Sequence, residues 1–125
     1  LVLTNRERVR LGVAPLVWSD AVATVARLHS ADMQARGFFD HQTPEGLTPG
    51  GRAARHGIRF DFCAENLFSF RTAPAGSDAI ASGLVKAWMY SAGHRQNLLA
   101  ADARYVGVGL AGAERALMAT QLFIG

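Results

Sequence analysis

Four histidines are the side chains of this sequence with the most versatile chemistry, because imidazole both transfers protons near neutral pH and binds divalent metals. Two of them, His41 and His94, stand among turn-forming and polar residues, where a ligand can reach them. Two histidines completed by a carboxylate or by water would suit zinc. We therefore take His41 and His94 as candidate metal ligands, with a chance pairing of two surface histidines as the alternative.

The other two histidines have simpler structural interpretations. His29 falls on a stripe of apolar residues at helical spacing, which predicts a hydrogen-bonded histidine in the core. His56 ends a short predicted helix, where an imidazole can interact with the negative end of the helix dipole.

Glu65 lies in an apolar segment, between Cys63-Ala64 and Leu67-Phe68. Its carboxylate is therefore expected to be partly buried and to need a partner. It could hold backbone amides or a histidine in place, or it could act as a general base. The local sequence leaves these roles open.

Structural interpretations also suffice for three further residues, Cys63, Asn66 and Asn97. Cys63 is the single cysteine, so it forms no intrachain disulfide, and it is most simply a small buried residue. Asn66 and Asn97 stand beside predicted element ends, where their amides can cap backbone groups.

The net charge of +3 and a cluster of Arg52, Arg55, His56 and Arg59 raise the possibility of nucleic-acid binding. The arginines are spaced three and four apart on a short predicted helix, which is more typical of a solvated face. We therefore expect no nucleic-acid partner.

Several enzyme signatures are absent from the sequence. There is no His-Glu-x-x-His zinc-protease pattern, no cysteine pair for zinc, no phosphate-binding glycine loop and no Gly-x-Ser-x-Gly nucleophile turn. Most recognisable enzyme classes are thereby disfavoured.

Capping and turn residues predict the elements that must position these side chains. Helices are expected over 3–11 with Gly12 as the stop, from Ser19 to Gly37, from Thr48 to Gly57, from Ser77 or Asp78 with Ser91 on its apolar face, and over 93–99. Val13 to Trp18 is predicted to be a connector, 38–46 a loop and 59–70 an extended segment. Tyr105 to Leu110 and Ala116 to Phe123 are predicted to be strands joined by a turn around Gly112.

This order of elements predicts an α+β protein with one domain over 1–125. The apolar stretches are too short for a membrane span, so no transmembrane segment is expected. The first residue is Leu1, and we expect a mature or trimmed fragment whose targeting peptide lies outside this chain. We expect a monomer.

Five blocks of sequence, taken in order, resemble the CAP superfamily (cysteine-rich secretory protein, antigen 5 and pathogenesis-related 1 proteins) of the bacterial type. They are Asn5–Arg8 with 12–19, 29–33 with 37–46, Cys63-Ala64-Glu65-Asn66-Leu67, the run Trp88-Met89-Tyr90-Ser91-Ala92-Gly93-His94-Arg95-Gln96-Asn97-Leu98-Leu99, and Val106-Gly107-Val108-Gly109.

The resemblance implies a three-layer α-β-α sandwich with a central, mainly antiparallel sheet and a surface groove. It implies that His41, His94 and Glu65 are three members of the family's tetrad of two histidines and two acids. The second acid is replaced by Ser91 here. A metal would then be held mainly by His41 and His94, with Glu65 behind them and water completing the site.

Three functions follow as hypotheses. The favoured one is an extracellular or cell-envelope module whose groove, lined by His41, Glu65, Asn66, Ser91 and His94, binds a divalent metal such as zinc, a small apolar or envelope-derived ligand, or both. The second is a metal-dependent hydrolase with Glu65 as general base. The third is a structural or adhesive envelope domain.

Overall fold

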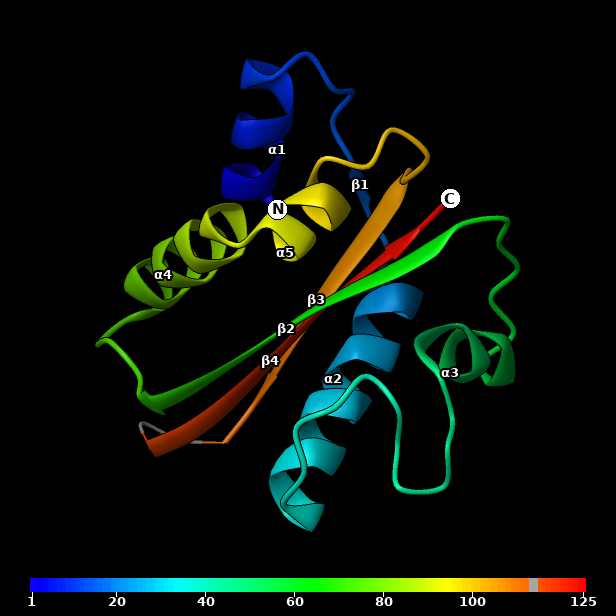
Figure 1. Cartoon of the computed structure of the whole chain (residues 1–125), viewed down its shortest axis with the longest axis vertical. Coiled ribbons are helices and arrows are strands. Elements are labelled where there is room, and N and C mark those ends of the chain that lie inside the picture. Colours follow the sequence, from blue (N-terminus) through cyan, green and yellow to red (C-terminus); the bar gives the residue numbers. More distant parts are fainter. Residues whose placement is uncertain (113–114) are drawn as a thin grey trace.

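The computed structural model describes residues 1–112 and 115–125, which form five helices and a four-stranded sheet (Figure 1). In chain order the elements are α1 (Val2–Arg10), β1 (Val17–Trp18), α2 (Asp20–Arg36), α3 (Pro49–Arg55), β2 (Cys63–Thr72), α4 (Ser77–Tyr90), α5 (Ala92–Leu98), β3 (Tyr105–Ala111) and β4 (Arg115–Ile124). No helix of these described ranges is both long and apolar enough to cross a bilayer.

The sheet has the strand order β1-β3-β4-β2, so β2 forms one of its edges. Strand β4 pairs antiparallel with both β2 and β3, whereas the short β1 pairs parallel with β3. The predicted sheet, mainly antiparallel, is thus confirmed.

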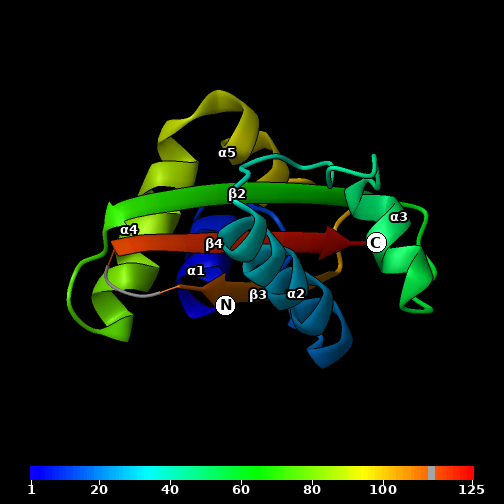
Figure 2. The same ribbon diagram turned by 90° about the horizontal axis from the view of Figure 1, so that it is seen from below.

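Helices cover both faces of this sheet and make the predicted three layers. Helices α2 and α3 lie on one face, and α1, α4 and α5 lie on the other (Figures 1 and 2). The core is divided accordingly, because alternate residues of β4 point to opposite faces. Phe123 packs with Trp88 of α4 and Leu98 of α5, while Leu122 packs with Val25 of α2.

Two glycines let α2 lie directly against β3. A Cβ atom added to Gly107 would come within 2.1 Å of the backbone nitrogen of Ala23, and one added to Gly109 within 2.1 Å of that of Arg27. No side chain fits such a gap, so the close approach of helix and strand requires glycine at both positions.

The capping residues predicted for α2 and α3 are confirmed. The Ser19 hydroxyl accepts a hydrogen bond from the backbone N–H of Val22, and the Thr48 hydroxyl accepts one from that of Gly51. Gly37 ends α2 in the left-handed conformation with φ of 68°. These caps fix the two ends of the loop that carries His41.

Several boundaries differ from the prediction. Val17–Trp18 is a two-residue strand rather than part of a connector, because its backbone pairs with β3. Strand β2 starts at Cys63 and continues to Thr72, and Ser91 is a cap between α4 and α5 rather than a face residue of α4. Of the predicted turn between β3 and β4, Gly112 is described with φ of 107°, and residues 113–114 lie outside the described residues.

Candidate functional site

The site forms at the edge strand β2, where consecutive side chains point to opposite faces of the sheet. Glu65 contacts Arg52 of α3 and His41 of the loop after α2, whereas Asn66 contacts the backbone of His94 in α5. Both Glu65 and Asn66 are buried. The edge of the sheet therefore brings together two histidines that belong to opposite helical layers.

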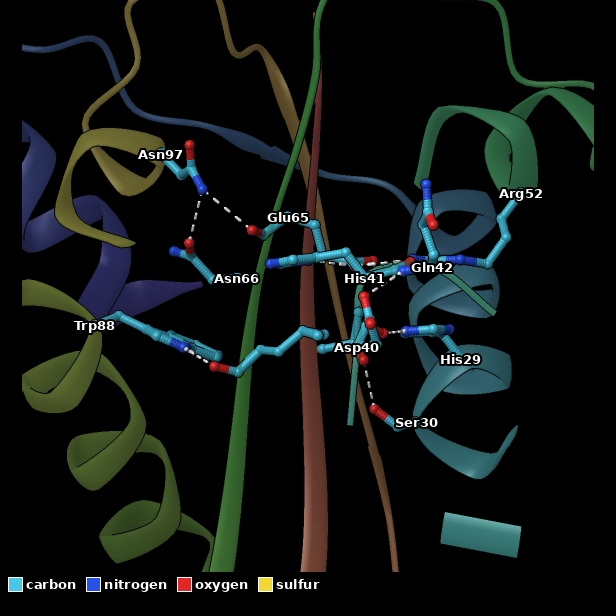
Figure 3. A network of polar contacts seen from close by, with 12 residues as sticks. His29, Ser30, Asp40, His41, Gln42, Arg52, Glu65, Asn66, Trp88 and Asn97 are labelled. Atoms are coloured by element: carbon cyan, nitrogen blue, oxygen red, sulfur yellow. Dashed lines mark hydrogen bonds and ion pairs between the residues drawn. The ribbon is translucent and has the colours of Figure 1, made fainter. Parts of the chain in front are cut away.

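Glu65 is the centre of a buried hydrogen-bonded cluster (Figure 3). Its Oε1 accepts hydrogen bonds from His41 Nδ1 at 3.0 Å and from Arg52 Nη2 at 2.8 Å. Arg52 Nη2 also donates to the backbone oxygen of His41 at 2.9 Å. The side chains of Glu65 and Arg52 are only 1% and 7% exposed, so a buried ion pair holds the base of the His41 loop.

This cluster orients the His41 ring. A carboxylate oxygen can only accept hydrogen bonds, so in the bond to Glu65 it is Nδ1 of His41 that carries the proton. Nε2 of His41 is therefore left for a ligand. The hydrogen bond to Glu65 raises the pKa of His41, because it favours the charged imidazolium. The ring is half-exposed and reaches the surface.

Amide hydrogen bonds hold His94 in place on the other side of β2. Asn66 Nδ2 donates to the backbone oxygen of His94 at 3.0 Å. Asn97 Nδ2 in turn donates to Asn66 Oδ1 at 3.0 Å and to the backbone oxygen of Glu65 at 3.1 Å (Figure 3). Burial and the nearby His41 both lower the pKa of His94, which favours its neutral form.

The two histidines line one surface hollow of about 390 Å³. The residues lining this hollow are Phe39, Asp40, His41, Leu67, Phe68, Ser69 and His94. Of the other predicted groove residues, Glu65 and Asn66 are buried behind the histidines, and Ser91 caps α5 outside this lining. Within the described ranges, no three His, Cys, Asp or Glu side chains come close enough together to hold a metal.

Arg52 is the site residue that sequence reasoning misplaced. The prediction put it with Arg55 and Arg59 on a solvated helix face, but the structure buries it against Glu65. The reason is that Arg52 points toward the sheet, where a buried carboxylate requires a cation. The predicted need of Glu65 for a partner was the one signal available in the sequence.

The local predictions for His29 and His56 are confirmed. His29 is buried, and its Nε2 donates to the backbone oxygen of Asp40 at 2.8 Å. His56 Nδ1 donates to the backbone oxygen of Arg52 at 3.0 Å and so caps the end of α3. Cys63, predicted to be buried, is only partly buried beside the core, and this burial raises the pKa of its thiol to about 11, which disfavours the reactive thiolate.

Comparison with known proteins identifies the family. The family model for CAP, described as the cysteine-rich secretory protein family, matches residues 1–123. This chain belongs to the CAP family. The resemblance found in the sequence is thereby confirmed.

Two relatives of this CAP domain come from Bacillus subtilis (strain 168). The domain is 36% identical over 98% of its length to the Bacillus subtilis (strain 168) "Uncharacterized protein YkwD" and covers 44% of that protein. It is 33% identical over 88% of its length to the "Uncharacterized membrane protein YlbC" of the same organism and covers 30% of that protein. The chain thus spans less than half the length of either relative.

Solved structures support the same fold. An extracellular protein containing a SCP domain from Bacillus anthracis str. Ames matches with a TM-score of 0.81 and 32% identity, over 97% of this chain and 37% of that chain. An outer surface protein from Borrelia burgdorferi matches with a TM-score of 0.82 over 97% of this chain and 85% of that chain. Its identity of 21% shows the fold alone.

Proposed function

We propose that this CAP domain is an extracellular or cell-envelope binding module, in which the hollow lined by His41 and His94 binds a divalent metal, zinc above all, together with a small ligand. The observation that carries the proposal is the placement of two imidazoles from opposite layers in one hollow. The location is supported by the relative at 32% identity that is described as extracellular.

The residues present fit a weak, open metal site. His41 offers Nε2, because Glu65 holds its Nδ1, and His94 supplies a second imidazole whose neutral form is favoured. Since no three His, Cys, Asp or Glu side chains of the described residues come close enough together to hold a metal, water would complete the coordination of a bound ion. A bound zinc ion would act as a Lewis acid toward an oxygen of the ligand.

The burial of Glu65 favours binding over hydrolysis. A general base must reach the proton that it removes, but Glu65 does not line the hollow, and its Oε1 already accepts from His41 and Arg52. The hydrogen bond from His41 Nδ1 instead suits Glu65 to a role in orienting the His41 ring. The apolar walls Phe39, Leu67 and Phe68 give a small apolar or envelope-derived ligand a contact surface beside the two rings.

Zinc titration by calorimetry on metal-stripped protein tests this proposal, with wild type compared with His41→Ala and His94→Ala. His56→Ala is the matched control, because His56 is an exposed histidine outside the hollow. We expect saturable binding near neutral pH in wild type and in the control, and loss in the other two variants. Binding should weaken at about pH 5.5, since ligating imidazoles must be neutral. Absence of binding in wild type would refute the metal site.

A further inference from the structure

The free edge of strand β2 runs along the hollow of His41 and His94. Strand β2 is an outer strand of the sheet and pairs with β4 on one side. Figure 2 shows β2 as the upper strand of the sheet, with β4 and β3 below it. Leu67, Phe68 and Ser69 of β2 belong to the lining of the hollow. A ligand in the hollow therefore meets the main chain of an edge strand as well as the two imidazoles.

Alternate residues of β2 direct their backbone groups toward β4 and toward the free edge. Phe62, the residue before the strand, exchanges two backbone hydrogen bonds with Gly125, one in each direction and each at 2.9 Å. The register of β2 and β4 continues from this pair, so the even-numbered residues of β2 bond to β4. The N–H and C=O groups of Leu67 and Ser69 therefore point to the free edge.

Side chains of the α4 and α5 layer occupy this edge as far as Leu67. The backbone oxygen of Glu65 accepts from Asn97 Nδ2 at 3.1 Å, and that of Leu67 accepts from Trp88 Nε1 at 3.0 Å (Figure 3). At Ser69 this cover ends, because Ser69 is exposed and no hydrogen bond within the described residues uses its N–H or C=O group. A free donor and acceptor on an edge strand form a template for a further strand.

Aromatic side chains from both helical layers stand beside this open stretch. Phe39, in the loop that follows α2, is 52% exposed although it is apolar. Phe68 packs against the core on the α4 face and is only partly buried. Both residues line the hollow. Because successive residues of an added strand point to opposite faces, two neighbouring apolar side chains of a ligand would each meet one aromatic wall.

We propose that the hollow binds an extended peptide chain, which adds to β2 as an outer strand through hydrogen bonds to the backbone of Ser69. Two neighbouring apolar side chains of this peptide pack against Phe39 and Phe68. The inference deepens the proposed function, because it names the ligand class of the same hollow, and it rests on the claim that this hollow binds a ligand. It does not depend on a metal at His41 and His94.

Short capped peptides test the proposal directly. The probes are acetylated and amidated hexapeptides with Thr and Lys around two central residues drawn from Val, Leu, Phe and Tyr. In NMR titrations, with and without zinc, at least one probe should bind saturably at millimolar concentration or below. Amide hydrogen exchange of Ser69 should then slow by about tenfold or more at saturation, while that of Phe68 and Phe70, whose N–H groups face β4, should not change.

N-methylation along the probe that binds most tightly tests the strand geometry. Only alternate N–H groups of an added strand face β2. Affinity should therefore fall about fivefold or more at every second position and less at the positions between them.

A pair of variants tests the same bond from the side of the protein. Ser69→Pro removes the outward N–H at an edge position that tolerates proline, whereas Ser69→Ala keeps it. Peptide affinity should fall about fivefold or more in Ser69→Pro and stay within about twofold in Ser69→Ala. Thermal unfolding checks that both variants are folded, and the N-methylated peptides carry the test if Ser69→Pro is not.

Three results would overturn the proposal. They are the absence of saturable binding by every probe, unchanged exchange of the Ser69 amide with a probe bound, and N-methylation effects that do not alternate. The zinc titration separates this proposal from the metal site. Peptide binding without zinc binding would refute the metal and leave strand addition intact, and zinc binding without protection of Ser69 would do the reverse.

Discussion

Replacement of Arg52 by methionine should cost this domain about 3–5 kcal/mol of unfolding free energy, the usual cost of breaking a buried ion pair from one side. Methionine keeps most of the apolar stem but removes the cation that lies 2.8 Å from Oε1 of Glu65. The Glu65 side chain is 1% exposed, so water cannot replace the lost partner. The backbone oxygen of His41 also loses its Arg52 donor. Since a domain of this size has about 5–15 kcal/mol of stability, the loss should be obvious.

Urea unfolding followed by circular dichroism measures this effect. Arg55→Met is the matched control on the same helix, and because Arg55 is exposed the change should stay within about 0.5 kcal/mol. The double variant Arg52→Met/Glu65→Leu should be more stable than Arg52→Met alone, because no uncompensated carboxylate is left in the interior. A loss of less than about 1 kcal/mol in Arg52→Met, or a double variant less stable than the single one, would refute the reasoning.

Three further perturbations follow from the packing and the hydrogen bonds. Gly107→Ala should destabilise by about 3 kcal/mol or more in thermal unfolding, since its Cβ would meet the backbone of α2, whereas Gly93→Ala, which meets nothing within 4 Å, should be neutral or stabilising. Burial, and after it the charge of Arg52, lowers the pKa of His29, so the unfolded chain binds this proton first. Stability should therefore fall as pH drops below about 6.5, and His29→Gln should show a smaller fall between neutral pH and pH 5. Asn66→Ala removes the amide that holds the His94 backbone and should weaken zinc binding about tenfold or more, while an unchanged affinity would show that Asn66 does not position His94.

Those parts of the fold that depend on single residues could be predicted from the sequence. Ser19 and Gly37 bound α2, and Thr48 with Pro49 begins α3, because capping depends on the local backbone and one side chain. The strands β3 and β4 were also expected, because their apolar runs end in turn residues.

The features that escaped prediction depend on partners distant in sequence. Val17–Trp18 becomes a strand only because β3 lies beside it, and two residues carry no pattern of their own. Arg52 is spaced like a residue of a solvated face, and only the folded position of Glu65 shows why it is buried. His41 and His94 could be selected by residue type, but their placement in one hollow depends on the edge position of β2.

The register of β2 decides the geometry of the whole site. Glu65 lies opposite Leu122 and Asn66 opposite Gln121 on β4, and these pairings direct the carboxylate to one helical layer and the amide to the other. A slip of one residue would exchange the two faces, so that Glu65 would point toward α5 and Asn66 toward Arg52. The apolar neighbours prevent this slip, because Phe68 packs in the core on the α5 face and Cys63 packs on the α2 face. The packing that stabilises the domain therefore also places the acid behind His41 and the amide behind His94.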